Sequence, residues 1–354
     1  MWVPLASADE RHGTKAATLA RLTRAGFAVP DGVVTADPEE PGGRDAIPPV
    51  LRALGGTRFA VRSSARGEDG ARASFAGQLH TTLNVPAAGV VDAVHRTAVS
   101  ARAGRVAAYA ARTARGIDTA VPVIVQVMVD ARVAGVAFTR HPVTGADRIV
   151  LEAVRGLGDR LVDGTTTPQR WTLDRARGQA TGTEVLTPRQ AEAIADTARR
   201  IEAALGDPQD IEWAIAGGQV WVLQARPITT VPAQGPALPA SGRPLVTGTP
   251  SSPGAATGRV RVVGGLDDFD RFAAGEVLVC HATSPAWTPL LARAAAVVTE
   301  TGGILAHAAI VAREFAIPAV TAATGAMARL TDGRRVIVDG TTGTVTAPNE
   351  EPIP

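Results

Sequence analysis

One histidine in the chain has the surroundings expected of a nucleophile that carries phosphate. His307 follows segment 299–306, in which a strand is expected to end before Gly302 and Gly303, and it opens a run that predicts a helix. Backbone N–H groups at a helix start attract anions, and glycine lets a backbone approach phosphate closely. Neutral imidazole is a competent nucleophile. We therefore predict that His307 accepts a phosphoryl group held at Gly302 and Gly303; the alternative is a histidine packed in an alanine-rich helix.

A second polar group follows an apolar strand early in the chain. Residues 59–61 lead into Arg62-Ser63-Ser64, and a loop with Gly67-Glu68-Asp69 and the segment 74–78 comes after them. Arginine offers a planar fork to phosphate oxygens, and serine and glycine expose hydroxyl and backbone donors. The pattern predicts a polyphosphate cradle that includes Arg62, Ser64, Ser74, Gly77 and Gln78. A solvated turn is the alternative.

The third group lies on a predicted hairpin that turns at Gly217-Gly218. Its even positions are polar and its odd positions apolar, so a loop of three residues would place all the polar groups on one face. A loop of two residues would instead separate Glu212 from Gln224. Carboxylate and amide oxygens beside arginine suit Mg²⁺ bound to phosphate, whereas a half-exposed sheet also alternates in this way. The polar positions are Asp210, Glu212, Gln224 and Arg226.

Secondary structure and domains are predicted from apolar periodicity and from proline. Helices are expected over 14–25 and 187–205, and strands over 121–129, 134–138, 258–263, 277–280, 296–299 and 336–338. Repeated proline between 229 and 253 predicts a semi-rigid connector, and a shorter break is expected at 37–49. The predicted domains are 1–230 and 250–348, joined by a linker over 231–249.

These segments resemble the ATP-grasp domain shared by phosphoenolpyruvate synthase, pyruvate phosphate dikinase and rifampin phosphotransferase. The matching segments are 15–19, 26–32, 60–78, 125–129, 135–139, 156–158, 210–213 and 223–227. Segments 282–290 and 299–314 resemble the swivelling phosphohistidine domain of the same enzymes. The resemblance implies an α/β (α+β) fold class, with an ATP-grasp domain followed by a small swivelling β/β/α phosphohistidine domain.

The resemblance also implies roles for individual residues. Lys15, which is the only lysine, would contact the ATP phosphates together with Arg62 and Arg226. The adenine would lie near Gln126, Met128 and Val129. Mg²⁺ would be held by Glu212 and Gln224, and His307 would be the phosphorylated residue.

Three positions or segments depart from the family's pattern. The helical region expected between residues 35 and 62 is shortened, His141 stands where asparagine is frequent, and Ala306 stands where serine, threonine or cysteine often precedes the histidine. We also expect the third, acceptor-binding domain of these enzymes to be absent.

The expected function is that of an ATP-dependent dikinase-type phosphotransferase that releases AMP and phosphate. It would pass the phosphoryl group through His307 to a hydroxyl or nitrogen of a small-molecule acceptor, in natural-product tailoring or antibiotic resistance. Two alternatives stay open. The chain could be the ATP and histidine subunit of a split phosphoenolpyruvate synthase-like system, with the acceptor domain on another chain, or a non-catalytic nucleotide-binding regulatory protein.

Composition argues against several other classes. Lys and Arg total 36 against 34 acidic residues, and no basic block supports nucleic-acid binding. No run approaches about 18 apolar residues, and the first ten residues do not resemble a signal peptide, so a cytoplasmic enzyme without a membrane partner is expected. Cys280, the only cysteine, lies in an apolar run and is expected to be a buried strand thiol.

Overall fold

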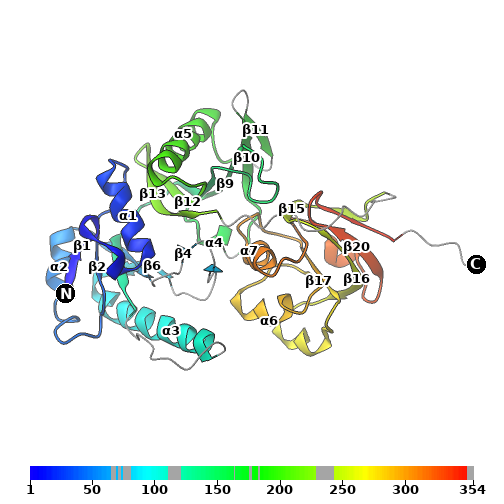
Figure 1. The fold of residues 1–354 in the computed structure, drawn as a ribbon, viewed down its shortest axis with the longest axis horizontal. Helices are drawn as coiled ribbons and strands as arrows, with labels where there is room; N and C mark the ends of the chain where they lie inside the picture. The colour runs from blue at the N-terminus through cyan, green and yellow to red at the C-terminus, as the bar shows by residue number, and fades with distance from the viewer. Residues whose placement is uncertain are drawn as a thin grey trace, which may run out of the picture. The chain divides into compact units, whose positions relative to one another are not determined.

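The computed structural model describes residues 1–64, 69–70, 73–74, 81–110, 121–162, 164–174, 178–181, 184–228 and 243–348 (Figure 1). For residues 69–70, 73–74 and 101–110 only the backbone is described. The chain divides into two compact units. The first unit consists of Met1–Ala137 and Asp196–Ile228, and the second consists of Phe138–Ala195 and Thr229–Pro354.

The first unit contains an antiparallel sheet with strand order β1-β2-β7-β3-β6. Its apolar face packs on two helices, α2 (Ile47–Leu54) and α3 (Val90–Ala110), and Phe59 and Val61 reach this face from alternate positions of β3. Arg62 therefore lies on the opposite face of the sheet. The strands are β1 (Trp2–Pro4), β2 (Gly32–Thr35), β3 (Arg58–Ser63), β6 (Thr81–Pro86) and β7 (Val123–Val127).

Two further features of the first unit position polar groups. Helix α1 (Thr14–Arg24) packs against the hairpin of β12 (Gln209–Ala216) and β13 (Gln219–Pro227). A small antiparallel pair, β4 (Asp69–Gly70) and β5 (Ala73–Ser74), lies beside β13 and α1 through β4. The break predicted at 37–49 was wrong at its end: α2 begins at Ile47, because Pro48 and Pro49 occupy its first turn, where proline is tolerated.

The second unit contains an antiparallel meander of β9 (Ile149–Arg155), β10 (Gln169–Leu173) and β11 (Gly178–Thr181). The short helix α4 (Asp159–Val162) follows β9. Strand β8 (Val133–Phe138) and helix α5 (Pro188–Leu205) each contain a boundary between the units.

Short 3-10 helices occur in both units, at Leu5–Ser7, Glu10–His12, Ala87–Gly89, Leu266–Arg271 and Pro285–Trp287.

An eight-stranded mixed sheet forms the rest of the second unit, in the order β14-β21-β20-β16-β17-β18-β19-β15. Its central strands β16 to β19 are parallel, and apolar clusters cover both faces. Helix α7 (His307–Glu314) packs against β15, β18 and β19 (Figure 1). The remaining elements are α6 (Thr288–Leu291), α8 (Ala326–Arg329), β14 (Val246–Thr247), β15 (Thr249–Ser252), β16 (Ala255–Val262), β17 (Val277–Cys280), β18 (Ala296–Thr299), β19 (Ala319–Thr321), β20 (Arg335–Asp339) and β21 (Thr344–Thr346).

Most predicted elements are present, and the α/β (α+β) fold class is confirmed. β17 and β18 have the predicted bounds, and α1 and α5 each differ from them by one residue. Of the predicted linker, residues 231–242 lie outside the described part of the chain, whereas β14 and the first residue of β15 fall within 243–249. No helix in the described ranges is long and apolar enough to cross a membrane.

Candidate active site

Two opposite charges from distant parts of the sequence meet in the first unit. Arg62, at the end of β3, donates from Nη2 to Oε2 of Glu212 in β12 at 2.6 Å, and from Nη1 to the carbonyl oxygen of Leu223 in β13 at 2.8 Å. The arginine side chain is 12% exposed and the glutamate side chain 33%. The predicted phosphate-binding arginine thus lies directly beside the predicted metal ligand.

The hairpin of β12 and β13 brings Glu212 and Gln224 opposite each other by a route that the sequence did not indicate. The loop has two residues, since Ala216 pairs with Gln219, and this is the length that by itself would separate Glu212 from Gln224. A β-bulge then inserts one extra residue, Leu223, and beyond it Glu212 pairs with Gln224. The bulge restores the parity that the short loop had broken, so the two side chains share one face.

The same bulge corrects the predicted apolar face. Between the turn and the bulge, Trp221 pairs with Ala214, so it lies on the face of the even residues of β12, not with Trp213 as predicted. Val222 takes that place opposite Trp213, and both side chains are buried.

Three cations act on the Glu212 carboxylate. Burial alone would raise its pKa, but the positive charges of Arg62, Lys15 and Arg226, together with the hydrogen bond from Arg62, hold the pKa below its usual value. Arg226 also donates from Nε to Oδ2 of Asp210 at 2.9 Å. The structure therefore brings together the predicted cations of the first unit around one ionised carboxylate.

Lys15 is positioned by a contact between α1 and the end of β3. The side chain of Ser64 is fully buried, and its Oγ accepts from the backbone N–H of Ala16 at 3.0 Å. Gly13 adopts φ 84° and packs so closely on Ser64 that a Cβ atom there would overlap the Ser64 carbonyl. Ser64 was predicted as a nucleotide-binding hydroxyl; the contact in the structure is with the first turn of the helix that carries Lys15.

The site's donors and acceptors fit a phosphate bound with a magnesium ion. Arg62 Nε is buried and has no hydrogen-bond partner within the described ranges, so one donor of its fork is available to an acceptor. Glu212 and Gln224 present a carboxylate and an amide on adjacent strands, and Mg²⁺ commonly takes one or two carboxylates plus phosphate oxygens. The described residues contain no cluster of three acidic, histidine or cysteine ligands.

The residues predicted near adenine lie at the end of β7. Gln126 is buried, and its Nε2 donates to the carbonyl oxygen of Pro30 at 3.1 Å. Met128 donates its backbone N–H to Arg58 at 2.9 Å, and the Val129 carbonyl accepts from Ala131. Met128 and Val129 are half-buried, so their segment keeps part of its surface accessible.

Part of the predicted phosphate loop lies outside the described residues. This holds for Gly77 and Gln78. Ser74 is described only by its backbone, in β5 opposite Asp69.

In the second unit, His307 is the first residue of α7, as the sequence predicted. Its Nδ1 lies 2.8 Å from Thr283 Oγ1, and its Nε2 lies 3.4 Å from Thr288 Oγ1. Thr288 donates its hydroxyl proton to Pro285, so toward the imidazole it can only accept. These hydroxyls stand in segment 282–290 and orient a ring whose preceding residue, Ala306, has no hydroxyl of its own.

Burial keeps the His307 imidazole neutral. The residue is 5% exposed, and burial lowers the pKa of the ring to about 4. A neutral ring retains the lone pair that a nucleophile needs. The sequence left a packed histidine open as the alternative to a nucleophile, and the structure shows that His307 is both buried and neutral.

The two glycines of the loop before His307 differ in their surroundings. Gly302 adopts φ 100°, a conformation that favours glycine. Gly303 lies against the side chain of Glu152 in β9, a residue that the sequence did not single out.

His141, which received no role from the sequence, supports a loop in the second unit. Its Nδ1 accepts from the backbone N–H groups of Val143 and Thr144, both at 3.2 Å. An asparagine side chain makes the same kind of bond to nearby backbone. Burial, followed by the positive charges of Arg170, Arg148 and Arg313, lowers the pKa of His141, which keeps Nδ1 an acceptor.

Two family models match the chain. The model described as pyruvate phosphate dikinase, AMP/ATP-binding domain, matches residues 44–186 and 178–240. The model described as PEP-utilising enzyme, mobile domain, matches residues 272–343. The first contains Arg62, Glu212 and Gln224, and the second contains His307.

Curated relatives agree with these matches. A probable phosphoenolpyruvate synthase of Methanothermobacter thermautotrophicus is 37% identical over 319 residues, covering 81% of this chain and 46% of the relative. A probable phosphoenolpyruvate synthase of Archaeoglobus fulgidus is 37% identical over 324 residues, covering 81% of this chain and 43% of the relative. The chain thus spans less than half the length of these two relatives.

Solved structures give weaker likenesses. A solution structure of Enzyme I is 31% identical with a TM-score of 0.20, covering 22% of this chain and 32% of that one. The VanG D-Ala:D-Ser ligase of Enterococcus faecalis is 14% identical with a TM-score of 0.37, covering 64% of this chain and 55% of that one.

Proposed function

The chain belongs to the phosphoenolpyruvate synthase and pyruvate phosphate dikinase family, and on this premise we propose that it is an ATP-dependent phosphotransferase with a phosphohistidine intermediate. The observation that carries the proposal is the convergence of three cations on Glu212 in the part of the chain that matches an AMP/ATP-binding domain. The neutral His307 at the start of a helix supports the second half of the proposal.

At the nucleotide, the proposed work of the protein is electrostatic. Arg62, Lys15 and Arg226 would bind the phosphate oxygens and spread the negative charge that develops during transfer. Arg62 is tied to Glu212 by a hydrogen bond, so a nucleotide would replace this internal partner with phosphate. Glu212 and Gln224 would hold a magnesium ion, whose positive charge would offset part of the negative charge of the phosphates.

At the histidine, the proposed step is attack by the imidazole on the β-phosphorus of ATP. Attack by Nε2 requires the tautomer with its proton on Nδ1; in that tautomer Nδ1–H would donate to Thr283, and Nε2 would exchange its contact with Thr288 for the phosphorus. Formation of the N–P bond breaks the bond to the α-phosphate oxygen and releases AMP. Transfer of the terminal phosphoryl group to water then releases phosphate and leaves one phosphoryl group on His307.

The proposal also includes the chemical class of the acceptor. Phosphohistidine would pass its phosphoryl group to a hydroxyl or nitrogen of a small molecule, with natural-product tailoring or antibiotic resistance as the setting. A split arrangement is the second candidate, in which the acceptor site lies on another polypeptide.

Product analysis tests the proposal. Incubation with ATP and Mg²⁺ should yield AMP and phosphate in equal amounts, whereas ADP as the product would contradict a dikinase. Arg62→Ala should abolish AMP formation. The matched control is Arg58→Ala on the same strand, where an exposed arginine donates to the Asn84 carbonyl at 3.0 Å and should be dispensable. Screening metabolites for faster AMP formation, with and without a barrel-type partner protein, would separate the two acceptor arrangements.

A further inference from the structure

A fully buried carboxylate in the second unit binds the loop that precedes His307. Glu152 lies in β9 and is 0% exposed. Its Oε1 accepts from the backbone N–H of Ile304 at 3.0 Å and from Nε of Arg170 at 3.2 Å, and Arg170 Nη2 also donates to it. Arg170 stands directly opposite Glu152 on β10. The ion pair of Glu152 and Arg170 thus lies within the meander, and the loop before His307 bonds to it through the backbone of Ile304.

The second oxygen of Glu152 shows that the loop fits closely. Oε2 is buried and has no hydrogen-bond partner within the described residues. It lies against Gly303, where an added Cβ atom would overlap the carboxylate. Leaving one oxygen of a buried carboxylate without a hydrogen bond costs free energy.

A second contact holds the same loop. Thr301 Oγ1 donates to the Gly164 carbonyl oxygen at 2.8 Å, in the segment that follows α4. Gly164 adopts φ 67°, and a Cβ atom there would lie 2.9 Å from the Cβ of Ala306. Residues on both sides of Ile304 therefore contact the segment after β9.

The two sides of this contact come from different family matches. Glu152, Gly164 and Arg170 lie in the match to the AMP/ATP-binding domain, whereas residues 301–306 lie in the match to the mobile domain. A mobile segment that carries phosphate must approach the ATP-binding part to be loaded. The buried carboxylate of Glu152 belongs to the ATP-binding part and bonds to the backbone near His307. It could therefore fix the position in which the mobile segment approaches.

We propose that Glu152 is a positioning residue that docks the loop 301–306 on the ATP-binding part of the chain while His307 is loaded. Arg170 holds the carboxylate in place, and Gly303 leaves the space that it occupies. This inference rests on the proposed phosphotransferase function, because it assigns Glu152 to the loading step of that reaction.

The test is a single-turnover measurement of His307 phosphorylation with β-³²P-labelled ATP and Mg²⁺, using the full chain. Glu152→Gln should lower the loading rate constant at saturating ATP by about 10- to 100-fold, the range expected for losing a charge-assisted hydrogen bond. The ATP concentration at half-maximal rate should not change, because the residues at the nucleotide are untouched.

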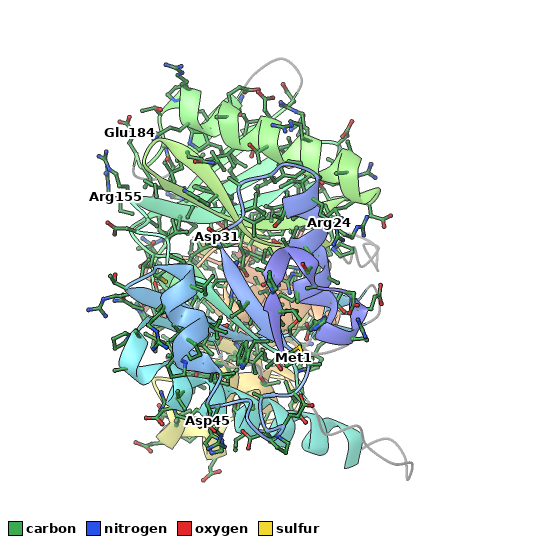
Figure 2. The ribbon with its side chains drawn as sticks, turned by 90° about the vertical axis from the view of Figure 1, so that its left-hand side faces the viewer. Met1, Arg24, Asp31, Asp45, Arg155 and Glu184 are labelled. Carbon is green, nitrogen blue, oxygen red and sulfur yellow. The ribbon has the colours of Figure 1, made fainter. Side chains whose placement is uncertain are left out.

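The matched control is Arg155→Ala, on the same strand. Its side chain donates to the Glu184 carbonyl oxygen at 3.0 Å, and Figure 2 shows the two labelled residues side by side. This variant should load at the wild-type rate. Thermal unfolding of each variant checks that the meander is intact.

Gly303→Ala provides an independent variant, since it keeps both charged side chains, Glu152 and Arg170, in the protein. It should slow loading by clashing with the carboxylate, and Glu152→Ala should relieve that clash. In a double-mutant cycle the two loading defects should therefore be far from additive.

The outcomes separate this inference from the proposed function. Loading of Glu152→Gln at the wild-type rate, or strictly additive defects in the cycle, would overturn the docking role while leaving the phosphotransferase intact. A wild-type chain that acquires no label on His307 would overturn the proposed function and the docking role with it.

Discussion

Acidification is expected to leave His307 chemically competent at a pH where an ordinary histidine is not. Burial lowers the pKa of its imidazole to about 4, against 6.5 for an ordinary ring. At about pH 5 a ring of ordinary pKa is about 97% protonated, whereas His307 is about 9% protonated. At that pH the neutral, nucleophilic fraction of His307 is therefore about thirtyfold larger than that of a histidine with the ordinary pKa.

The assay combines ring titration with kinetics. Titration of ¹⁵N-labelled imidazole by NMR, with His307→Gln to assign the signal, should give a midpoint near 4 and a single tautomer held by Thr283. The loading rate is measured as label on the protein. Protonation of His307 should not lower this rate between about pH 6 and 7, where an ordinary histidine becomes protonated.

The same burial predicts how stability depends on pH. The unfolded chain takes up the proton below about pH 6.5, whereas folded His307 resists it until about pH 4. The free energy of unfolding therefore decreases as pH falls through this window and is unaffected above it. The difference corresponds to about 3 kcal/mol, which His307→Gln should remove. His141, which also has a lowered pKa, remains in that variant as an internal control. A midpoint near 6.5 for His307 would refute the reasoning.

Three further changes follow from the described contacts. Ser64→Ala should cost about 1 kcal/mol of stability and weaken ATP binding, because it removes the acceptor for the Ala16 N–H and loosens the turn that carries Lys15; denaturation and nucleotide titration would show both effects. Glu212→Gln should reduce AMP formation by at least about 100-fold and change its dependence on Mg²⁺ concentration, since the carboxylate charge is lost; an unchanged magnesium titration would contradict its proposed role. Burial raises the pKa of the Cys280 thiol, so it should react with thiol reagents only on unfolding, and Cys280→Ala should form AMP at the wild-type rate.

The sequence predicted the elements that carry the chemistry better than their connections. Strands β17 and β18 and the start of α7 at His307 follow from apolar runs and glycine signals, which act locally. The single polar face of the hairpin was expected only if the loop had three residues, whereas the loop has two. Glu212 and Gln224 share a face because of the bulge at Leu223. This bulge depends on how β12 and β13 pair and cannot be predicted from any single residue type.

Contacts between distant segments were also beyond reach of the sequence. Ser64 bears the hydroxyl expected in a phosphate loop, yet that hydroxyl accepts from the backbone N–H of Ala16, 48 residues away. In the sequence, Glu152 is a single acidic residue within an apolar run. Its contacts with Arg170 and Ile304 become evident only in the folded structure. For His141, the signal was present in its place within a turn rich in Gly, Pro and Thr, where side-chain bonds to backbone are common.

The most direct measurement asks which atom of the protein receives phosphorus from ATP. After incubation with β-³²P-labelled ATP and Mg²⁺, the chain should carry acid-labile, alkali-stable label that peptide mapping assigns to His307, with one AMP released per label. His307→Gln should carry none, whereas His281→Gln, which changes an exposed histidine, should be labelled like the wild type. Label retained by the His307 variant, or its absence from a folded wild-type chain, would contradict the phosphohistidine account.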